Sequence, residues 1–457
     1  MDHLLVRLGR RTILLADVHR STDGHGIGYG TLLIRTRRAF QFGQLARVPV
    51  LCVPWKRALN TAVTQLHSDE LTVIRPESWV GRSLTVLWYL AAPFRIGDPI
   101  LWMKRSIARL VVGPFYEAVE RSTRLPRRVR RFIMRQDALY GKLKAVNAAY
   151  AVKSEALWQH AYSDQALARL RAIEEAGQSV RPLCLRIPAE RERQVAREAA
   201  GLGLDPSARL VTVHVRESGY RQRAGLRQRG WDDIRNARIE SFFPAFATLV
   251  GRGYTVVRLG DPTMTPVDLP GVVDLATSPA RNQWLDIWCT MRSEFLIGCD
   301  SGPSWLAMLL DVPILTVNAV HFRDLSRPAD RITCKLARDT TTGETLSVSE
   351  MLTDEFLRVG FKGDRYDCVD NSPADLRRAV LDMIEVVHGR ERRSSWQNRF
   401  NRLLHAAERQ GLGGRSALDG VVINGRARGT LSHGFAKKHF VRERTPRVEQ
   451  TPRTLGG

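Results

Sequence analysis

The chain has 457 residues, 44% of them hydrophobic, which is more than one ordinary core accommodates, so we expect two domains with extensions. Its 70 Lys and Arg residues against 47 Asp and Glu give a formal charge of +23, which favours an anionic partner: nucleotide phosphate, lipid headgroup, acidic glycan or nucleic acid. The six cysteines are scattered without metal-ligand spacing, which excludes a disulfide scaffold and favours a reducing compartment. The N-terminus lacks the apolar core of a signal peptide, so we expect a cytoplasmic protein.

The first half opens with the pattern of a βαβ unit. Residues 12–18 predict a buried strand, 24–30 a glycine-rich turn, 32–46 a helix and 48–53 a second strand. The turn resembles a dinucleotide-binding loop, but its glycines alternate and no acidic residue ends the second strand, which argues against NAD. We therefore interpret it as a loop facing a cleft, with His25 as its titratable group.

An apolar, Trp-containing stretch follows at 83–115. Arg95 and Asp98 interrupt it before it reaches the length of a transmembrane helix, so it suits either an interfacial helix on an anionic membrane or a helix packed on the first domain. A cluster of arginines at 121–135 is either a solvated helix face or a polyanion-binding patch.

These patterns divide the chain into three parts. We expect residues 1–190 to form an N-terminal domain with a helical, basic insertion at about 70–177, and residues 191–390 to form a second domain. Residues 391–457 form a basic C-terminal extension with a disordered end.

The second half alternates strands and helices, which predicts a mainly parallel sheet covered on both faces. Its central stretch, 295–318, combines a strand, the turn Asp-Ser-Gly-Pro-Ser, a helix and a second strand. The turn is either an ordinary capped helix start or an anion site built on free N–H groups.

Polar residues collect at the expected carboxyl ends of three strands, where ligands bind in such sheets. A diphosphate pocket here would use Arg216 as a fork onto phosphate oxygens and the helix start at Ser301 as N–H donor. The alternative is that His214 and Arg216 make structural hydrogen bonds below the sheet edge.

The segments HVRESGY (214–220), RN (235–236), VVRLGDPTM (256–264) and IGCDSGPSWLAMLLDVPILTVN (297–318) resemble a family of bacterial glycosyltransferases. The helix start is similar to the donor-site turn of heptosyltransferases, and HVR is similar to the HxR motif of fucosyltransferases, although Gly219 and Tyr220 stand where those enzymes carry an acid. The resemblance implies an α/β protein of GT-B-like fold, with two Rossmann-like domains facing across a cleft and helical insertions.

The resemblance further implies transfer of a sugar from a nucleotide-diphosphate donor to a bacterial surface glycan or lipid-linked acceptor, peripherally at the cytoplasmic face of the membrane. No metal or cofactor is expected, because no DxD motif occurs and cations with helix dipoles would stabilise the leaving diphosphate. The predicted catalytic residues are His25 and His214. The predicted donor and diphosphate contacts are Arg216, Arg258, Gly260, Asp261, Asp300, Ser301, Gly302 and Ser304, and the predicted substrate contacts are Gly24, Gly26, Tyr220, Arg235, Asn236 and Asn318.

Two alternatives stay open from the sequence. One is a nucleotide-sugar epimerase or hydrolase on the same scaffold, since a fold does not fix a reaction. The other is a basic module that binds nucleic acid through 121–135 and the C-terminal tail. Aromatic residues are not interleaved with those arginines as stacking platforms would be, which argues against nucleic acid as a partner.

Overall fold

The computed structural model describes residues 3–8, 11–17, 50–53, 62–66, 71–73, 185–219, 233–409 with short gaps at 321, 323–324, 326 and 363, and 429–440, together with a few single positions from 79 to 103. The chain divides into two compact units, one formed by residues 1–24 and 35–186 and the other by residues 25–34 and 187–457. Each unit is considered by itself below.

The described part of the first unit is a four-stranded sheet in the order β1-β2-β3-β4. Its elements are β1 (His3–Leu8), β2 (Arg11–Asp17), β3 (Val50–Val53), the short 3-10 helix η2 (Val63–Gln65) and β4 (Leu71–Val73). Strands β1 and β2 form an antiparallel pair, whereas β2, β3 and β4 are parallel. The strands expected at 12–18 and 48–53 are present as β2 and β3, and β1 was not predicted. The glycine-rich turn at 24–30 lies outside the described residues.

The second unit is built on a seven-stranded sheet in the order β13-β10-β9-β8-β5-β6-β7, and every pair of neighbours is parallel. Its strands are β5 (Arg209–His214), β6 (Tyr254–Arg258), β7 (Val272–Asp274), β8 (Ser293–Gly298), β9 (Ile314–Ala319), β10 (Arg331–Cys334) and β13 (Thr430–Leu431). The run from β7 through β5 to β10 has the strand order of a doubly wound Rossmann sheet. The prediction of a mainly parallel sheet is therefore confirmed.

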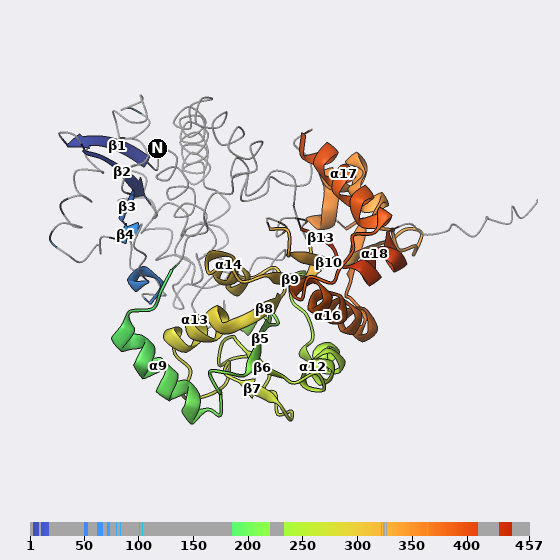
Figure 1. Cartoon of the computed structure of the whole chain (residues 1–457). Coiled ribbons are helices and arrows are strands. Elements are labelled where there is room, and N and C mark those ends of the chain that lie inside the picture. The colour runs from blue at the N-terminus through green and yellow to red at the C-terminus, as the bar shows by residue number, and fades with distance from the viewer. Residues whose placement is uncertain are drawn as a thin grey trace, which may run out of the picture. The chain divides into compact units, whose positions relative to one another are not determined.

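Helices cover both faces of this sheet (Figure 1). They are α9 (Ala189–Gly201), α12 (Phe243–Val250), α13 (Gln283–Arg292), α14 (Gly302–Leu309) and α16 (Pro373–Val387), with the short η4 (Ile239–Phe242) leading into α12. One apolar cluster joins α12 and α16 to β5, β6, β8 and β9, and α13 and α14 pack near β5 and β8 with α9 outside α13. Apart from β7, whose residues are partly buried at the sheet edge, the strands are almost entirely buried, as expected of a parallel sheet that has helices on both faces.

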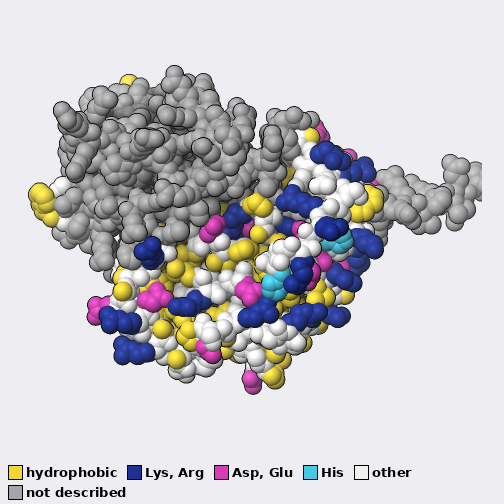
Figure 2. Space-filling model, viewed as in Figure 1, with side chains coloured by type: hydrophobic (Ala, Val, Ile, Leu, Met, Phe, Trp, Pro, Cys, Tyr) yellow, Lys and Arg dark blue, Asp and Glu magenta, His cyan; other side chains and the backbone are white. Residues whose placement is uncertain are grey.

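The segment after residue 390 belongs to this unit. It contributes α17 (Ser395–Arg409), β13 and α18 (His433–His439), and β13 pairs with β10 at the sheet edge. The buried Gln397 donates from Nε2 to the Leu431 carbonyl at 2.8 Å, which fixes α17 to β13. Lys and Arg side chains gather on the surface over α16, α17 and α18 (Figure 2). Its apolar side chains, Phe400, Leu404 and Phe435 among them, share one buried cluster with Ile332 of β10.

A smaller antiparallel pair, β11 (Leu336–Asp339) and β12 (Tyr366–Val369), lies between β10 and α16 in the sequence. The short helices η5 (Glu350–Leu352), α15 (Asp354–Val359) and η6 (Gly360–Lys362) connect its strands. Phe356 and Tyr366 belong to the same apolar cluster as Phe400 and Phe440, so this pair packs with α17 and α18.

Candidate functional site

The direction of strand succession reverses between β5 and β8, which are neighbours in the sheet. From β5 the chain proceeds to β6 and β7 on one side, and from β8 it proceeds to β9 and β10 on the other. Ligands of doubly wound sheets bind in the crevice outside the carboxyl ends of the strands at such a reversal. His214 ends β5 opposite Gly298, which ends β8, and the Cys299 amide donates to the His214 carbonyl at 3.2 Å. The two strand ends therefore mark the place where the crevice of such a fold would lie.

The helix start expected after β8 is present, because α14 begins at Gly302 directly after Ser301. Gly298 allows this close turn, since a Cβ atom there would lie 2.6 Å from the Ser304 Oγ. Ser304 instead donates to the Cys299 carbonyl at 3.2 Å and is buried. Pro303 occupies the first helical turn, where its missing N–H is not needed.

Ser301 takes the N-cap position with extended backbone, but its side chain makes no capping hydrogen bond. Its Oγ lies 2.8 Å from Nδ1 of His214 instead, so the hydroxyl links the two strand ends across the crevice. The N–H groups of the first turn of α14 are consequently not occupied by this hydroxyl. Free N–H groups at a helix start favour an anion.

His214 is neutral at physiological pH. Burial, together with the positive charges of Arg258, Arg216 and Arg281, lowers its pKa from 6.5 to about 3. A neutral imidazole accepts a hydrogen bond at one ring nitrogen and donates from the other, so His214 is suited to orient Ser301 rather than to act as a cationic acid.

Arg216 lies just beyond the end of β5 and is partly exposed. Its Nη1 donates to Oδ1 of Asn236, and its backbone carbonyl accepts from the Ala237 amide at 3.1 Å. Arg235 donates from Nη1 to the Asp300 carbonyl at 3.2 Å. The Arg-Asn pair at 235–236 therefore connects the segment after β5 with the segment after β8, although the two are distant in sequence.

The side chains of Asp300 and Asn318 both accept hydrogen bonds from backbone N–H groups at the sheet edge. The Asp300 carboxylate accepts from the Val320 amide at 2.9 Å, which ties the end of β8 to the end of β9. Asn318 has a positive φ of 51° and is fully buried. Its amide donates to Oδ1 of Asn371 at 2.8 Å, and its own Oδ1 accepts from the Asn371 amide at 2.6 Å. These two residues shape the edge of the sheet.

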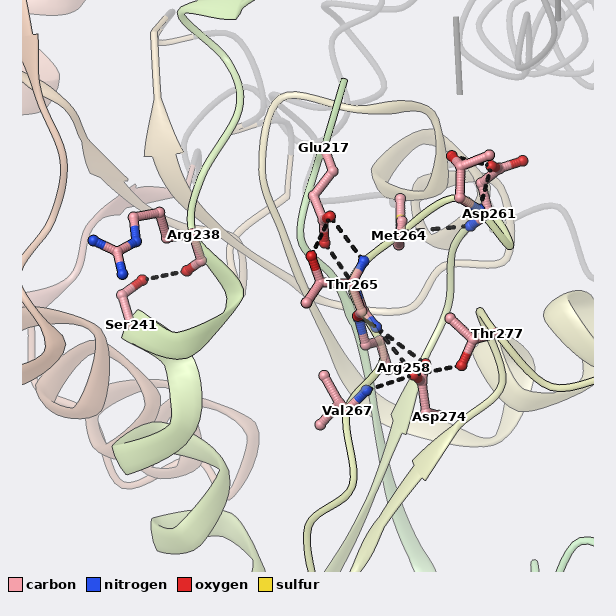
Figure 3. A network of polar contacts seen from close by, with 11 residues as sticks. Glu217, Arg238, Ser241, Arg258, Asp261, Met264, Thr265, Val267, Asp274 and Thr277 are labelled. Carbon is pink, nitrogen blue, oxygen red and sulfur yellow. Dashed lines mark hydrogen bonds and ion pairs between the residues drawn. The ribbon is translucent and has the colours of Figure 1, made fainter. Parts of the chain in front are cut away.

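Arg258, predicted to bind the donor, lies in a different environment (Figure 3). Its side chain is 0% exposed, and its Nη atoms contact Glu217 at 2.8 Å and Asp274 at 3.1 Å. Nη1 also donates to the Thr265 carbonyl at 2.6 Å. Two carboxylates enclose the guanidinium, so Arg258 connects β6, β7 and the segment after β5, and its donor contact stays a prediction.

Gly260 and Asp261 form the turn that follows β6. A Cβ atom at Gly260 would lie 2.3 Å from the Met264 Sδ, so the turn requires glycine for close packing. Asp261 accepts from the amide of Thr263 at 3.0 Å and from its hydroxyl at 2.6 Å (Figure 3). Such contacts are typical of an aspartate that stabilises its own turn.

The sequence interpretation missed Arg281, which precedes α13. Its charge acts on His214, so it lies near the crevice, and its side chain is 30% exposed. It pairs with Asp286 at 3.5 Å, while its Nε is buried and has no hydrogen-bond partner among the described residues. The sequence did contain a signal for Arg281: it directly precedes Asn282, the residue that caps α13 at the same sheet edge.

Four predicted site residues, Gly24, His25, Gly26 and Tyr220, lie outside the described residues. Within the described ranges, no three His, Cys, Asp or Glu side chains gather as possible ligands of a metal ion. Burial raises the pKa of the Cys299 thiol to about 11, so this cysteine beside the crevice is not an activated nucleophile.

Neither a known family model nor a curated protein matches the chain. The structure is similar to the crystal structure of a glycosyl transferase family 9 protein from Veillonella parvula DSM 2008, with 13% identity and a TM-score of 0.30 over 63% of this chain and 77% of the other.

Proposed function

We propose that the chain is a glycosyltransferase that takes a sugar from a nucleotide-diphosphate donor and that the second unit binds the donor. The observation that carries this proposal is the meeting of His214 and Ser301 at 2.8 Å, at the strand reversal between β5 and β8 and close to Arg216. Strand order supports a nucleotide site at this place, and the sequence motifs that resemble glycosyltransferases fall on the same two strand ends.

Electrostatics support an anionic group as the ligand. The positive charges of Arg216 and Arg281 both act on His214, and α14 begins beside it. A departing nucleoside diphosphate develops negative charge at its phosphates, and fixed cations with helix N–H groups stabilise such charge without a metal ion. We therefore propose that Arg216, Ser301 and Gly302 contact the diphosphate, with Asp300 and Asn236 shaping the pocket.

The acceptor is proposed to be a bacterial surface glycan or a lipid-linked sugar, bound by the first unit. This assignment corresponds to the GT-B arrangement. His25 is the proposed general base because imidazole titrates near neutral pH. The pKa of about 3 argues against a proton-transfer role for His214, whose proposed task is to hold Ser301.

The first test is a thermal-shift screen against nucleoside diphosphates and nucleotide sugars, followed by calorimetry on every ligand that raises the melting temperature. Binding stabilises a folded protein in proportion to the logarithm of ligand concentration, so a genuine ligand gives a rising series of melting temperatures. Stabilisation by a nucleoside diphosphate, but not by the nucleoside alone, is the expected result. A flat response to all diphosphates contradicts the proposal.

A peripheral position on an anionic membrane is proposed for the first unit. Ile100 and Met103 are helical, three positions apart and 61% and 50% exposed, and Trp79 is 81% exposed. Ile100 and Met103 lie in the apolar stretch at 83–115, and Trp79 lies just before it. Exposed apolar side chains of this kind suit an interfacial helix. The arginine cluster at 121–135 lies outside the described residues. None of the helices among the described residues combines the length and apolar character needed to cross a bilayer.

Liposome co-sedimentation tests this position. Binding to anionic vesicles should weaken as salt rises, because screening shortens the reach of charge attraction to about 8 Å at physiological ionic strength. Replacing Ile100 and Met103 together by Ser should weaken binding at every salt concentration. Equal binding to neutral and anionic vesicles contradicts the electrostatic part of the proposal.

A further inference from the structure

A buried lysine lies near the crevice. Lys335 follows β10, and its side chain is 3% exposed. Its Nζ lies 2.6 Å from Oδ1 of Asp370 and donates to the backbone carbonyl of Asn236 at 2.7 Å. Burying an ammonium group is costly, and an apolar side chain often stabilises such a position equally well. Stability alone is therefore a weak explanation for Lys335.

The residue that Lys335 holds is the one that contacts Arg216. Oδ1 of Asn236 accepts from Nη1 of Arg216, and the next residue, Ala237, donates its amide to the Arg216 carbonyl at 3.1 Å. The Asn236 amide is also bound, to the Asp233 carbonyl at 3.0 Å. Because Lys335 fixes the backbone of Asn236, it fixes the place where the carboxamide meets the guanidinium.

We propose that Lys335 is a positioning residue that acts through Asn236 to hold Arg216 in its diphosphate-binding orientation. The inference rests on the proposed function, since it needs Arg216 to contact a diphosphate. Lys335 itself does not touch the ligand. The ammonium group fixes the backbone of Asn236, and the Asn236 carboxamide then fixes the Arg216 guanidinium. An arginine that is free to adopt other rotamers binds a diphosphate more weakly, because binding must first order its side chain.

The substitution Lys335→Met is suited to testing this role. Asp370 is 42% exposed, so its carboxylate can be hydrated when the ammonium is removed, and methionine fills the vacated volume. The matched control is Lys438→Met on α18. Lys438 pairs with Asp375 at 2.8 Å, so the control removes the same charge from another Lys–Asp pair that has no contact with Asn236.

The experiment is a double-mutant cycle measured by calorimetry with the nucleoside diphosphate that the wild type binds best among UDP, ADP and GDP. The proteins are wild type, Arg216→Ala, Lys335→Met, the double variant and the Lys438→Met control, each checked by urea unfolding. Lys335→Met should weaken binding about threefold to tenfold, and the double variant should bind no more weakly than Arg216→Ala alone, because coupled residues are not additive. Lys438→Met should bind like the wild type.

The outcomes separate this inference from the proposed function. Wild-type affinity in Lys335→Met, or losses that multiply in the double variant, overturns the positioning role while Arg216 keeps its own. If the wild type binds none of the three nucleotides, or Arg216→Ala binds normally, the proposed function fails and the positioning role fails with it. An equal loss in Lys438→Met would assign the effect to net charge and also overturn the inference. If Lys335→Met is unfolded, Asn236→Ala takes its place in the same cycle, and an additive loss there contradicts the inference.

Discussion

Two arginines near the ends of neighbouring strands have opposite surroundings. Arg258 at the end of β6 is 0% exposed between Glu217 and Asp274. Arg216 beyond the end of β5 is partly exposed and contacts the neutral carboxamide of Asn236. Both charges reach His214. The comparison shows that a cation at a strand end becomes a structural residue when carboxylates enclose it, whereas a solvent-accessible cation at the strand reversal can meet a ligand.

The largest expected effect concerns stability at Arg258. Arg258→Met leaves Glu217 and Asp274 without their cation, and removing one partner of a buried ion pair costs about 3–5 kcal/mol. The free energy of unfolding in urea should fall by this amount, while Arg216→Met should change it far less. Similar losses in the two variants would remove the distinction between the arginines.

The second experiment compares the two arginines by nucleotide affinity instead of stability. Arg216→Ala should remove a charged hydrogen bond of about 1.5–3 kcal/mol, which is roughly tenfold or more in dissociation constant. Calorimetry with a nucleoside diphosphate at fixed salt measures it, and urea unfolding of the same sample is the control for folding. Unchanged affinity in a folded variant contradicts a diphosphate role for Arg216.

The pH dependence of stability tests the surroundings of both arginines, because the charges of Arg216 and Arg258 both lower the pKa of His214. Its pKa is about 3 in the folded chain and near 6.5 when unfolded, so the unfolded state binds the extra proton between these values. The contribution of neutral His214 is complete above pH 6.5 and declines as pH falls toward 3. Lowering the pH from 7.5 to 5 should cost about 2 kcal/mol through this residue.

The measurement for His214 is urea unfolding of the wild type and of His214→Asn across that pH range. The wild type should lose more stability than the variant as pH falls, because asparagine does not titrate. Parallel pH profiles would show that the imidazole is not buried beside the two cations as described.

The smallest expected effect is that of metal removal. If cations and helix N–H groups stabilise the diphosphate, nucleotide affinity and glycosyl transfer should persist in excess EDTA. Magnesium and manganese are added back as controls. Activity that EDTA abolishes and either ion restores contradicts the metal-independent mechanism.

The sequence predicted the parallel α/β sheet, because its strands are continuous apolar runs separated by helical patterns. It also predicted that His214 and Ser301 lie at one sheet edge. It did not predict that Arg258 pairs with Glu217 and Asp274, because Glu217 lies in the segment after β5 and Asp274 ends β7. Strand β13 was missed because it has two residues and no periodicity, and Arg281 was missed because its role depends on where α13 begins.

The pairing of β13 with β10 has a consequence for how the chain folds. Arg331 and Thr430 are partners, yet α15, α16 and α17 lie between them in the sequence. Contacts between segments so far apart are slow to form because a long loop must close first. During synthesis, the edge of β10 that pairs with β13 therefore stays unpaired until α17 and β13 have been made.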